Sequence, residues 1–491
     1  MKKRHLLGVF SLFCIEYAYL VWYNYLSYFH FLKGNIMARL TEGKIFKTLF
    51  IYSLPLILTN VVQLLFHAAD VTVLGIMVDD TAVAAVGACG PIISLLVSLF
   101  ASFATGANIL IAKHVGAGNE ERARKATGTA MIVGFASGVI MMIVALIWAE
   151  DILILMKCQS DVLDLATTYM RIYFLGMPVI MLYNFSAAVL RSVGDSLRPM
   201  IYMLIAGVVN IGLNVFFIAV CHLTVIGVAL ATFTSNAISL LLALIALFRN
   251  KGYCKIEIKN LRIFKSEIKE IIKIGVPACL CSLSFYIANL FVAAGVNSIS
   301  TDAMTSGALA GQYDAIVYNV GMSIAVACMS IVGQCYGAGL IDRVKKVVGV
   351  SAIYAAASSL LIGSLVVIFS RPLLDIMTDS EAVIELGREQ LRVVCLTHFI
   401  TSLMEVLSFS LRALKRPNCT LIVGFICGFG IRTLWVTVVW KMLGKTVTNL
   451  FFAYGVSAFM AMTIYFVIFI AVIKKEKALR EKENPQAWAL S

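Results

Sequence analysis

Two carboxylates stand out in this 491-residue sequence because each lies inside a long apolar stretch: Asp70 and Glu405. An ionisable side chain at the centre of a bilayer costs at least about 2.5–3.5 kcal/mol on insertion scales, so such a residue suggests a site or a pathway. A buried carboxylate can coordinate a cation or carry a proton. The chemistry therefore depends on which other polar groups the neighbouring segments place at the same depth.

Neutral oxygen-bearing side chains occur near the predicted depth of Asp70. At about 1.5 Å per residue, Asp70 lies roughly 8 Å from the outer end of its helix and Asn210 roughly 18 Å from the inner end of another. Asn214 follows one turn further out, and Thr232 lies roughly 12 Å from the outer end of the next helix. We predict that these four residues form a coupling-cation site. Oxygen donors of this kind suit Na⁺, whereas a desolvated, hydrogen-bonded carboxylate could instead carry H⁺. The alternative is that the two asparagines and the threonine only join helices by hydrogen bonds.

Three further residues have predicted roles. Glu405 lies roughly 10 Å from the inner side, whereas its candidate neighbour Asn289 lies roughly 24 Å in, so the two depths disagree. We predict that Glu405 and Asn289 line a cleft in the second half of the chain. Pro55 shares a helix with Asp70 and removes one backbone hydrogen bond there, so it is a predicted kink.

The composition identifies the class of protein. Hydrophobic residues make up 60% of the chain and charged residues 14%, against about 25% charged residues in a soluble domain. A transmembrane helix takes roughly 20 apolar residues. This composition excludes a soluble enzyme, a disordered protein and a coiled coil. We predict an all-α polytopic membrane protein with helices over 45–74, 81–112, 126–149, 161–190, 198–220, 225–248, 268–296, 303–335, 347–370, 383–411, 418–440 and 448–473.

An internal repeat organises these helices. The Gly-Ala-Gly turn at 116–118 recurs at 337–339, an offset of 221 residues, and Arg198-Pro199 recurs at 416–417, an offset of 218. Pro55 recurs as Pro277 at 222. We predict two pseudo-symmetric lobes of six helices each, related as a parallel repeat about an axis along the membrane normal. The predicted divisions are 37–248 for the first lobe, 249–267 for a cytoplasmic linker, 268–473 for the second lobe and 474–491 for a cytoplasmic tail.

The basic residues set the expected orientation. The net charge is +13, and most Lys and Arg fall in alternate loops, which indicates a cell (inner) membrane protein whose twelve-helix body has both ends in the cytoplasm. The apolar segment 6–32 conflicts with this arrangement, because one more span there would invert every later loop. We therefore expect Met37 to be the true start, with residues 1–36 a doubtful extension.

Common catalytic motifs are missing from the sequence. There is no HExxH and no GxSxG, the six histidines are dispersed and the 12 cysteines form no CxxC. Gly444-Lys445-Thr446 resembles the end of a phosphate-binding loop, but Val439 stands where its first glycine belongs. We expect no enzymatic activity, no bound metal, no nucleic-acid partner and no cofactor other than H⁺ or Na⁺ as coupling ion.

Several motifs together resemble the multidrug and toxic compound extrusion (MATE) family over roughly 41–473. They are Pro55 followed fifteen residues later by Asp70, the paired Gly-Ala-Gly turns, LRSVGDSLRP at 190–199 with LRALKRP at 411–417, NIGLN at 210–214 and GVALAT at 227–232. The resemblance implies two lobes around a V-shaped cleft and export driven by a Na⁺ or H⁺ gradient. It also implies that Asp70, Asn210, Asn214 and Thr232 fall on the first-lobe cation site of the family.

The chain departs from this family pattern at two of the named positions. Some prokaryotic members have Asp where this chain has Asn214, which leaves the site with less negative charge here. Glu405 is placed like a second-lobe carboxylate of other branches, whereas Asn289 stands where those branches carry Glu. Both departures bear on which cation the chain uses.

The leading hypothesis is a monomeric antiporter in the lipid bilayer that expels small amphiphilic, cationic substrates. Met and Phe side chains beside a carboxylate would bind such molecules through adaptable packing and cation–π contact. One alternative is a flippase for lipid-linked precursors, which would need a cationic cleft, and few Arg or Lys lie deep in the predicted helices. Another is a channel or a non-transporting membrane scaffold, against which the repeat and Asp70 both argue.

Overall fold

The computed structural model describes residues 40–78, 80–156 and 158–483. Within these ranges the regular structure is helical, and eleven helices are long and apolar enough to cross a membrane, or twelve if one bent pair forms a single span. The predicted all-α polytopic fold is confirmed, whereas the proposed extension at 1–36 lies outside the described residues. The helices are α2 (Ile45–Met77), α3 (Asp80–Gly116), α4 (Glu120–Leu155), α5 (Ser160–Leu175), α6 (Met177–Ser192), α7 (Leu197–Ala219), α8 (Val225–Arg249), η1 (Ile258–Asn260), α9 (Lys265–Asn297), α10 (Thr301–Gly337), α11 (Ile341–Ile368), α12 (Ser370–Asp375), α13 (Glu381–Ala413), α14 (Pro417–Val423), η2 (Gly424–Ile431), α15 (Arg432–Leu434), η3 (Trp435–Val439), α16 (Trp440–Leu443) and α17 (Val447–Glu483).

The predicted helix at 161–190 is broken in the structure. α5 and α6 meet at Gly176 with a bend of 47°. Pro178, in the first turn of α6, has no backbone N–H and so cannot donate to the carbonyl of Phe174 one turn earlier. The missing hydrogen bond explains why one apolar stretch forms two helices.

The segment Pro417–Leu443, which we name span 11, departs from regular α-helix. Its backbone is a π-helix over Gly424–Ile431 and again over Trp435–Val439, with Arg432–Leu434 between them. A π-helix adds residues to each turn and is frequently found at functional sites. Span 11 is therefore a place to look for unusual side chains.

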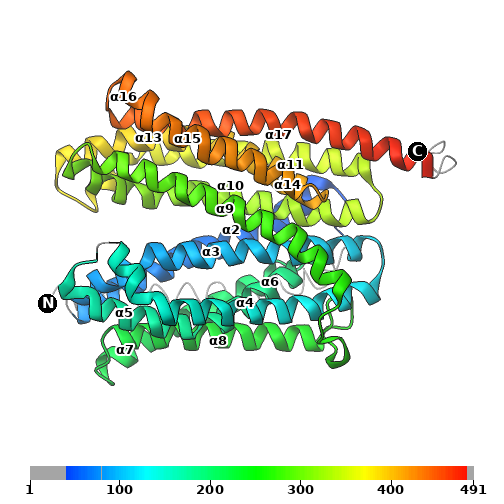
Figure 1. The fold of residues 1–491 in the computed structure, drawn as a ribbon, viewed down its shortest axis with the longest axis horizontal. Coiled ribbons are helices and arrows are strands. Elements are labelled where there is room, and N and C mark those ends of the chain that lie inside the picture. The colour runs from blue at the N-terminus through cyan, green and yellow to red at the C-terminus, as the bar shows by residue number, and fades with distance from the viewer. Residues whose placement is uncertain (1–39, 79, 157, 484–491) are drawn as a thin grey trace. The chain divides into compact units, whose positions relative to one another are not determined.

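The described residues divide into two compact units. The first contains 58–107 and 120–268, and the second contains 40–57, 108–119 and 269–483. In the first unit α4 packs on α5 and α6, and α8 packs on α6 and α7. In the second unit α13 packs against α10, α11 and α17 (Figure 1). The lobe boundaries expected from the repeat stay a prediction.

A reciprocal contact joins two helix ends inside the second unit. A Cβ atom on Gly116 of α3 would lie 1.9 Å from the carbonyl oxygen of Gln334 on α10. A Cβ atom on Gly337 would likewise lie 2.1 Å from the carbonyl oxygen of Lys113. Gly337 follows Gly116 by 221 residues, and Gln334 follows Lys113 by the same number. The two repeats therefore make the same contact twice, each with a glycine packed against a backbone carbonyl of the other repeat.

The stretch expected to be a linker is docked on α4 within the first unit. Arg124 donates to Glu257 at 2.7 Å, and the hydroxyl of Thr129 donates to the carbonyl of Arg262 at 3.3 Å. A Cβ atom on Gly128 would lie 1.9 Å from the carbonyl oxygen of Asn260. The linker thus lies on the surface of α4 and makes ordered contacts there.

Candidate cation site and a buried arginine

The structure brings the four predicted cation-site residues together within the first unit. Asn214 on α7 donates from Nδ2 to Oδ1 of Asp70 on α2 at 2.5 Å, and to Oδ1 of Asn210 at 3.3 Å. Asn210 in turn lies 3.5 Å from the hydroxyl of Thr232 on α8. In the alternative orientation of its amide, Asn210 instead donates to Oδ1 of Asp70 at 2.7 Å and accepts from the backbone N–H of Thr232 at 3.3 Å, and the hydrogen bond from Asn214 to Asn210 is lost. We refer to these four residues as the Asp70 cluster; its role in cation binding stays a prediction.

The spacing of the two asparagines and one close helix contact explain the geometry. Asn210 and Asn214 are four residues apart and so share one face of α7. One turn earlier on that face, a Cβ atom on Gly207 would lie 1.6 Å from the ring of Phe66 on α2. Phe66 is itself one turn before Asp70. The missing side chain of Gly207 therefore lets α7 approach α2 closely enough for its amides to reach the carboxylate.

The described side chains that contact Asp70 are uncharged. Among the described side chains Asp70 forms no ion pair, and its hydrogen-bond donor is the amide of Asn214. A basic partner would hold a carboxylate in its ionised form, whereas amide donors leave it able to take up a proton. An amide can also turn its oxygen toward a bound metal cation. The Asp70 cluster is thus chemically suited to either coupling ion.

Pro55 lies inside α2, buried, about four turns before Asp70. The proline ring cannot donate a hydrogen bond to the carbonyl of Ile51. Because the helix continues through this position from Ile45 to Met77, the predicted kink stays a prediction.

Glu405 and Asn289 belong to different polar centres of the second unit. Asn289 on α9 accepts a hydrogen bond from Nη1 of Arg432 at 2.6 Å. Glu405 is buried on α13, where it interacts electrostatically with Arg412 two turns further along. No hydrogen bond joins Glu405 to Asn289 in the described part of the chain. Each residue therefore faces an arginine, and their common role in a cleft stays a prediction.

Arg432 is a functional candidate that the sequence analysis missed. Its side chain lies in the middle of span 11 and the residue is only 6% exposed. Nη2 donates to Ser457 at 3.3 Å, and the guanidinium carbon lies 4.3 Å from the ring centroid of Tyr454 and 5.6 Å from that of Phe285. We refer to Arg432 and these partners, with Asn289, as the Arg432 centre. The expectation of few deep basic residues overlooked this one.

A second missed pair joins α10 and α13. Nε2 of His398 lies 2.5 Å from Oδ1 of Asp314, and the His398 side chain is 7% exposed. Tyr318 packs beside the imidazole, with ring centroids 6.0 Å apart. Both residues lie inside predicted helices, at 303–335 and 383–411, but the sequence does not show that these two helices place them side by side.

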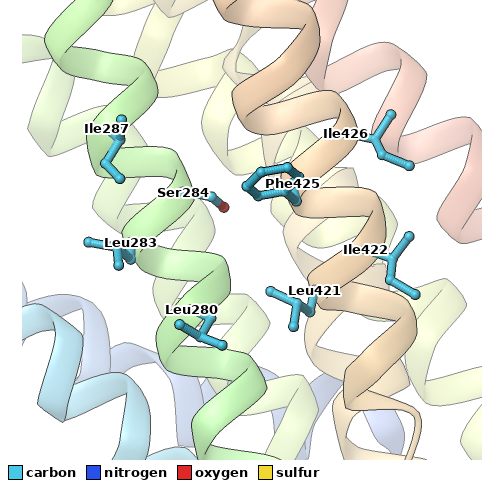
Figure 2. Close-up of a pocket in the computed structure, with 8 residues that line it drawn as sticks. All are labelled: Leu280, Leu283, Ser284, Ile287, Leu421, Ile422, Phe425 and Ile426. Carbon is cyan, nitrogen blue, oxygen red and sulfur yellow. The ribbon is translucent and has the colours of Figure 1, made fainter.

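An apolar cavity of about 420 Å³ lies between α9 and span 11. Figure 2 shows that Ser284 carries the one polar side chain among the eight residues drawn around it, and its hydroxyl already donates to the carbonyl of Cys281 at 2.7 Å. Two of the lining residues, Leu280 and Phe425, are 44% and 55% exposed. In a membrane such a surface suits hydrocarbon, so we do not place ion chemistry there.

Comparison with known proteins agrees with the repeat. The family model MatE matches residues 55–216 and again residues 277–436. The probable multidrug resistance protein YoeA of Bacillus subtilis is 26% identical over 77% of this chain and 83% of its own length. The multidrug export protein MepA of Staphylococcus aureus is 26% identical over 53% of this chain and 59% of its own.

Solved structures show the same fold. A MOP superfamily transporter from Pyrococcus furiosus superposes with a TM-score of 0.84 at 21% identity, covering 90% of this chain and 99% of that one. A variant of the MATE transporter VcmN from Vibrio cholerae gives 0.80 at 19% identity, covering 89% and 97%. The predicted fold class of twelve spans in two lobes is thereby confirmed, and because the family model matches both halves, the chain belongs to the MatE family of efflux transporters.

Proposed function

We propose that this protein is a secondary active multidrug exporter that couples the outward movement of small amphiphilic, cationic substrates to the inward movement of H⁺ or Na⁺. Membership of the family and the names of the relatives YoeA and MepA support multidrug export. The Asp70 cluster is the observation that supports cation coupling, because a partly buried carboxylate held by amides can take up and release a small cation.

In this proposal the two lobes alternate between outward and inward access. Asp70 binds the coupling cation from the outside, and loss of its charge on binding favours the inward-releasing state. Burial of a charged carboxylate is costly, whereas the neutralised form is tolerated, so occupancy of Asp70 biases the equilibrium between states. ATP is not required, since the gradient supplies the free energy.

The proposed location is the inner membrane, with both ends of the twelve-helix body in the cytoplasm. The basic loops support this orientation. Cys221 is exposed in the loop before α8, on the predicted outer side. A membrane-impermeant maleimide should label Cys221 in intact cells, and a Cys221→Ser variant supplies the background. Labelling only after the cells are opened would contradict the orientation.

The central test is transport into or out of sealed vesicles that contain the purified full chain. Under an imposed pH or Na⁺ gradient the parent should move a fluorescent organic cation, without ATP. Asp70→Asn should abolish gradient-driven transport while dye binding remains measurable, because the amide replaces several hydrogen bonds but cannot bind the coupling cation. Asp164→Asn is the matched control, since Asp164 is exposed on α5 in the same unit. Equal transport by Asp70→Asn and the parent would overturn the coupling role.

A further inference from the structure

The Arg432 centre occupies the position in the second half that the Asp70 cluster occupies in the first. The Asp70 cluster lies on α2, α7 and α8, and the Arg432 centre lies on their repeat counterparts α9, span 11 and α17. The offset of 218 residues that relates Arg198-Pro199 to Arg416-Pro417 also relates Asn214 to Arg432. The offset of 222 that relates Pro55 to Pro277 also relates Thr232 to Tyr454.

The charge at the two centres is opposite. At the offset of 222 Asp70 corresponds to Val292, so the second half has no carboxylate at that position. Asn214, which donates to the carboxylate in the first half, is replaced by the guanidinium of Arg432. One half therefore carries a partly buried negative group held by amides, and the other carries a buried positive group held by an amide, a hydroxyl and two rings.

The positive charge of Arg432 has only neutral partners. Nη1 donates to Asn289 and Nη2 to Ser457, whereas Nε has no acceptor. Among the described residues no carboxylate forms an ion pair with Arg432. A buried cation without an opposite charge is costly within a membrane and marks a functional site more often than a structural one. The π-helical backbone on both sides of Arg432 is a second, independent sign of a functional site.

We propose that the Arg432 centre binds an oxyanion, the carboxylate or phosphate of a transported amphiphile, so that the substrates include molecules with an acidic group as well as cations. A guanidinium donates in a planar fork that matches two oxygens of such a group. The rings of Tyr454 and Phe285 supply apolar surface beside it. This inference rests on the proposed export function and names a further class of substrate for it.

A binding titration tests the inference without any need for transport. The probes are a rhodamine dye with a free carboxylate and its methyl ester, which differ only in the acidic group. The purified full chain should bind the carboxylate dye more tightly than the ester. Because a hydrogen bond to a charged group is worth about 1.5–3 kcal/mol, Arg432→Gln should weaken binding of the carboxylate dye roughly tenfold or more and leave the ester nearly unchanged.

Arg432→Lys distinguishes the contribution of the positive charge from that of the planar guanidinium. The lysine keeps the positive charge without the fork, so it should retain part of the preference for the carboxylate dye. Equal weakening of both dyes in Arg432→Gln would show a merely structural arginine and overturn the inference, as would a parent that binds both dyes equally. Displacement of the carboxylate dye by an anionic phospholipid, but not by a zwitterionic one, would assign the centre to a lipid headgroup and overturn the substrate role.

The same proteins in vesicles keep the two proposals distinct. A parent that prefers the carboxylate dye in the titration but moves neither dye under a gradient contradicts the export function and leaves the oxyanion site supported. A parent that exports both dyes, with Arg432→Gln still exporting the carboxylate dye at the parent rate, contradicts the oxyanion site and leaves the export function intact.

Discussion

Nδ2 of Asn214 lies 2.5 Å from Oδ1 of Asp70, although the two residues are 144 positions apart in the chain. An amide next to a single carboxylate leaves room for one proton or one metal cation. The chemistry of position 214 should therefore decide which of the two drives transport.

Asn214→Asp should make transport depend on Na⁺. A second carboxylate next to Asp70 adds negative charge and hard oxygen donors, both of which favour a metal cation. The measurement is vesicle transport with Na⁺ varied at constant pH, for the parent and the variant. A Na⁺ dependence present only in the variant identifies the parent as proton-driven. Identical Na⁺ responses in both proteins would contradict the role assigned to position 214.

Much of this site could be predicted before the structure because its signals lie in the sequence itself. Asp70 is conspicuous as a charge in an apolar helix, and Asn210 and Asn214 share a helical face. Gly207 and Arg432 were both missed, for different reasons. The role of Gly207 is visible only in the structure, where the ring of Phe66 occupies the space that a side chain at position 207 would need. Arg432 lies inside the predicted helix 418–440, so the signal that identified Asp70, a charge within an apolar helix, could have identified it too.

The bend between α5 and α6 and the π-helix of span 11 were also missed. Hydropathy measures the length of an apolar segment but does not record which backbone hydrogen bonds form within it. In contrast, Pro178 was visible in the sequence and could have indicated the break.

Gly207→Ala should disable transport. The new methyl group would meet the Phe66 ring, which would force α7 away from α2 and separate Asn214 from Asp70. Overpacking of this kind costs about 1–3 kcal/mol of stability, so the variant should fold but lose coupling. Gly212→Ala on the same helix is the matched control, because nothing lies within 4 Å of its Cβ position.

A double variant checks the explanation for Gly207. Replacing Phe66 by Leu in the Gly207→Ala background removes part of the obstructing ring and should restore some gradient-driven transport. Normal transport by Gly207→Ala alone would show that the contact between α2 and α7 does not position the Asp70 cluster.

Gly128→Ala should release the linker from α4. The added Cβ atom would collide with the carbonyl of Asn260. The backbone around Lys255 and Lys259 should then leave α4, and trypsin should cleave it faster. The repeat supplies the control, since Gly349 corresponds to Gly128 but has nothing within 4 Å. Equal cleavage rates for Gly128→Ala, Gly349→Ala and the parent would contradict docking of the linker.

Docking of the linker should also weaken in acid. The hydrogen bond from Lys259, with a further contribution from Arg124, holds the pKa of Glu257 below its ordinary value of 4.5. A lowered pKa in the folded state means that the interaction stabilises the linker above that ordinary value and is lost as the pH falls through the folded one.

Hydrogen exchange of the linker amides, corrected for its intrinsic pH dependence, measures this effect. Protection in the parent should fall as the pH is lowered through the ordinary pKa of 4.5 and below it, and Glu257→Gln should show a smaller change over the same range. An equal loss of protection in both proteins would assign the acid sensitivity to other groups.

The contact between the ends of α3 and α10 has the form of an isologous interface, in which one surface meets itself across a two-fold axis. Gly116 lies on the backbone of Gln334, and Gly337 lies on that of Lys113. A protein consisting of a single repeat could use the same surface to form a homodimer, with each copy placing its glycine on the other. After duplication and fusion of such a repeat, positions 116 and 337 can mutate separately. Each position still has to stay without a side chain, because the backbone of the other repeat lies against it as it would in the dimer.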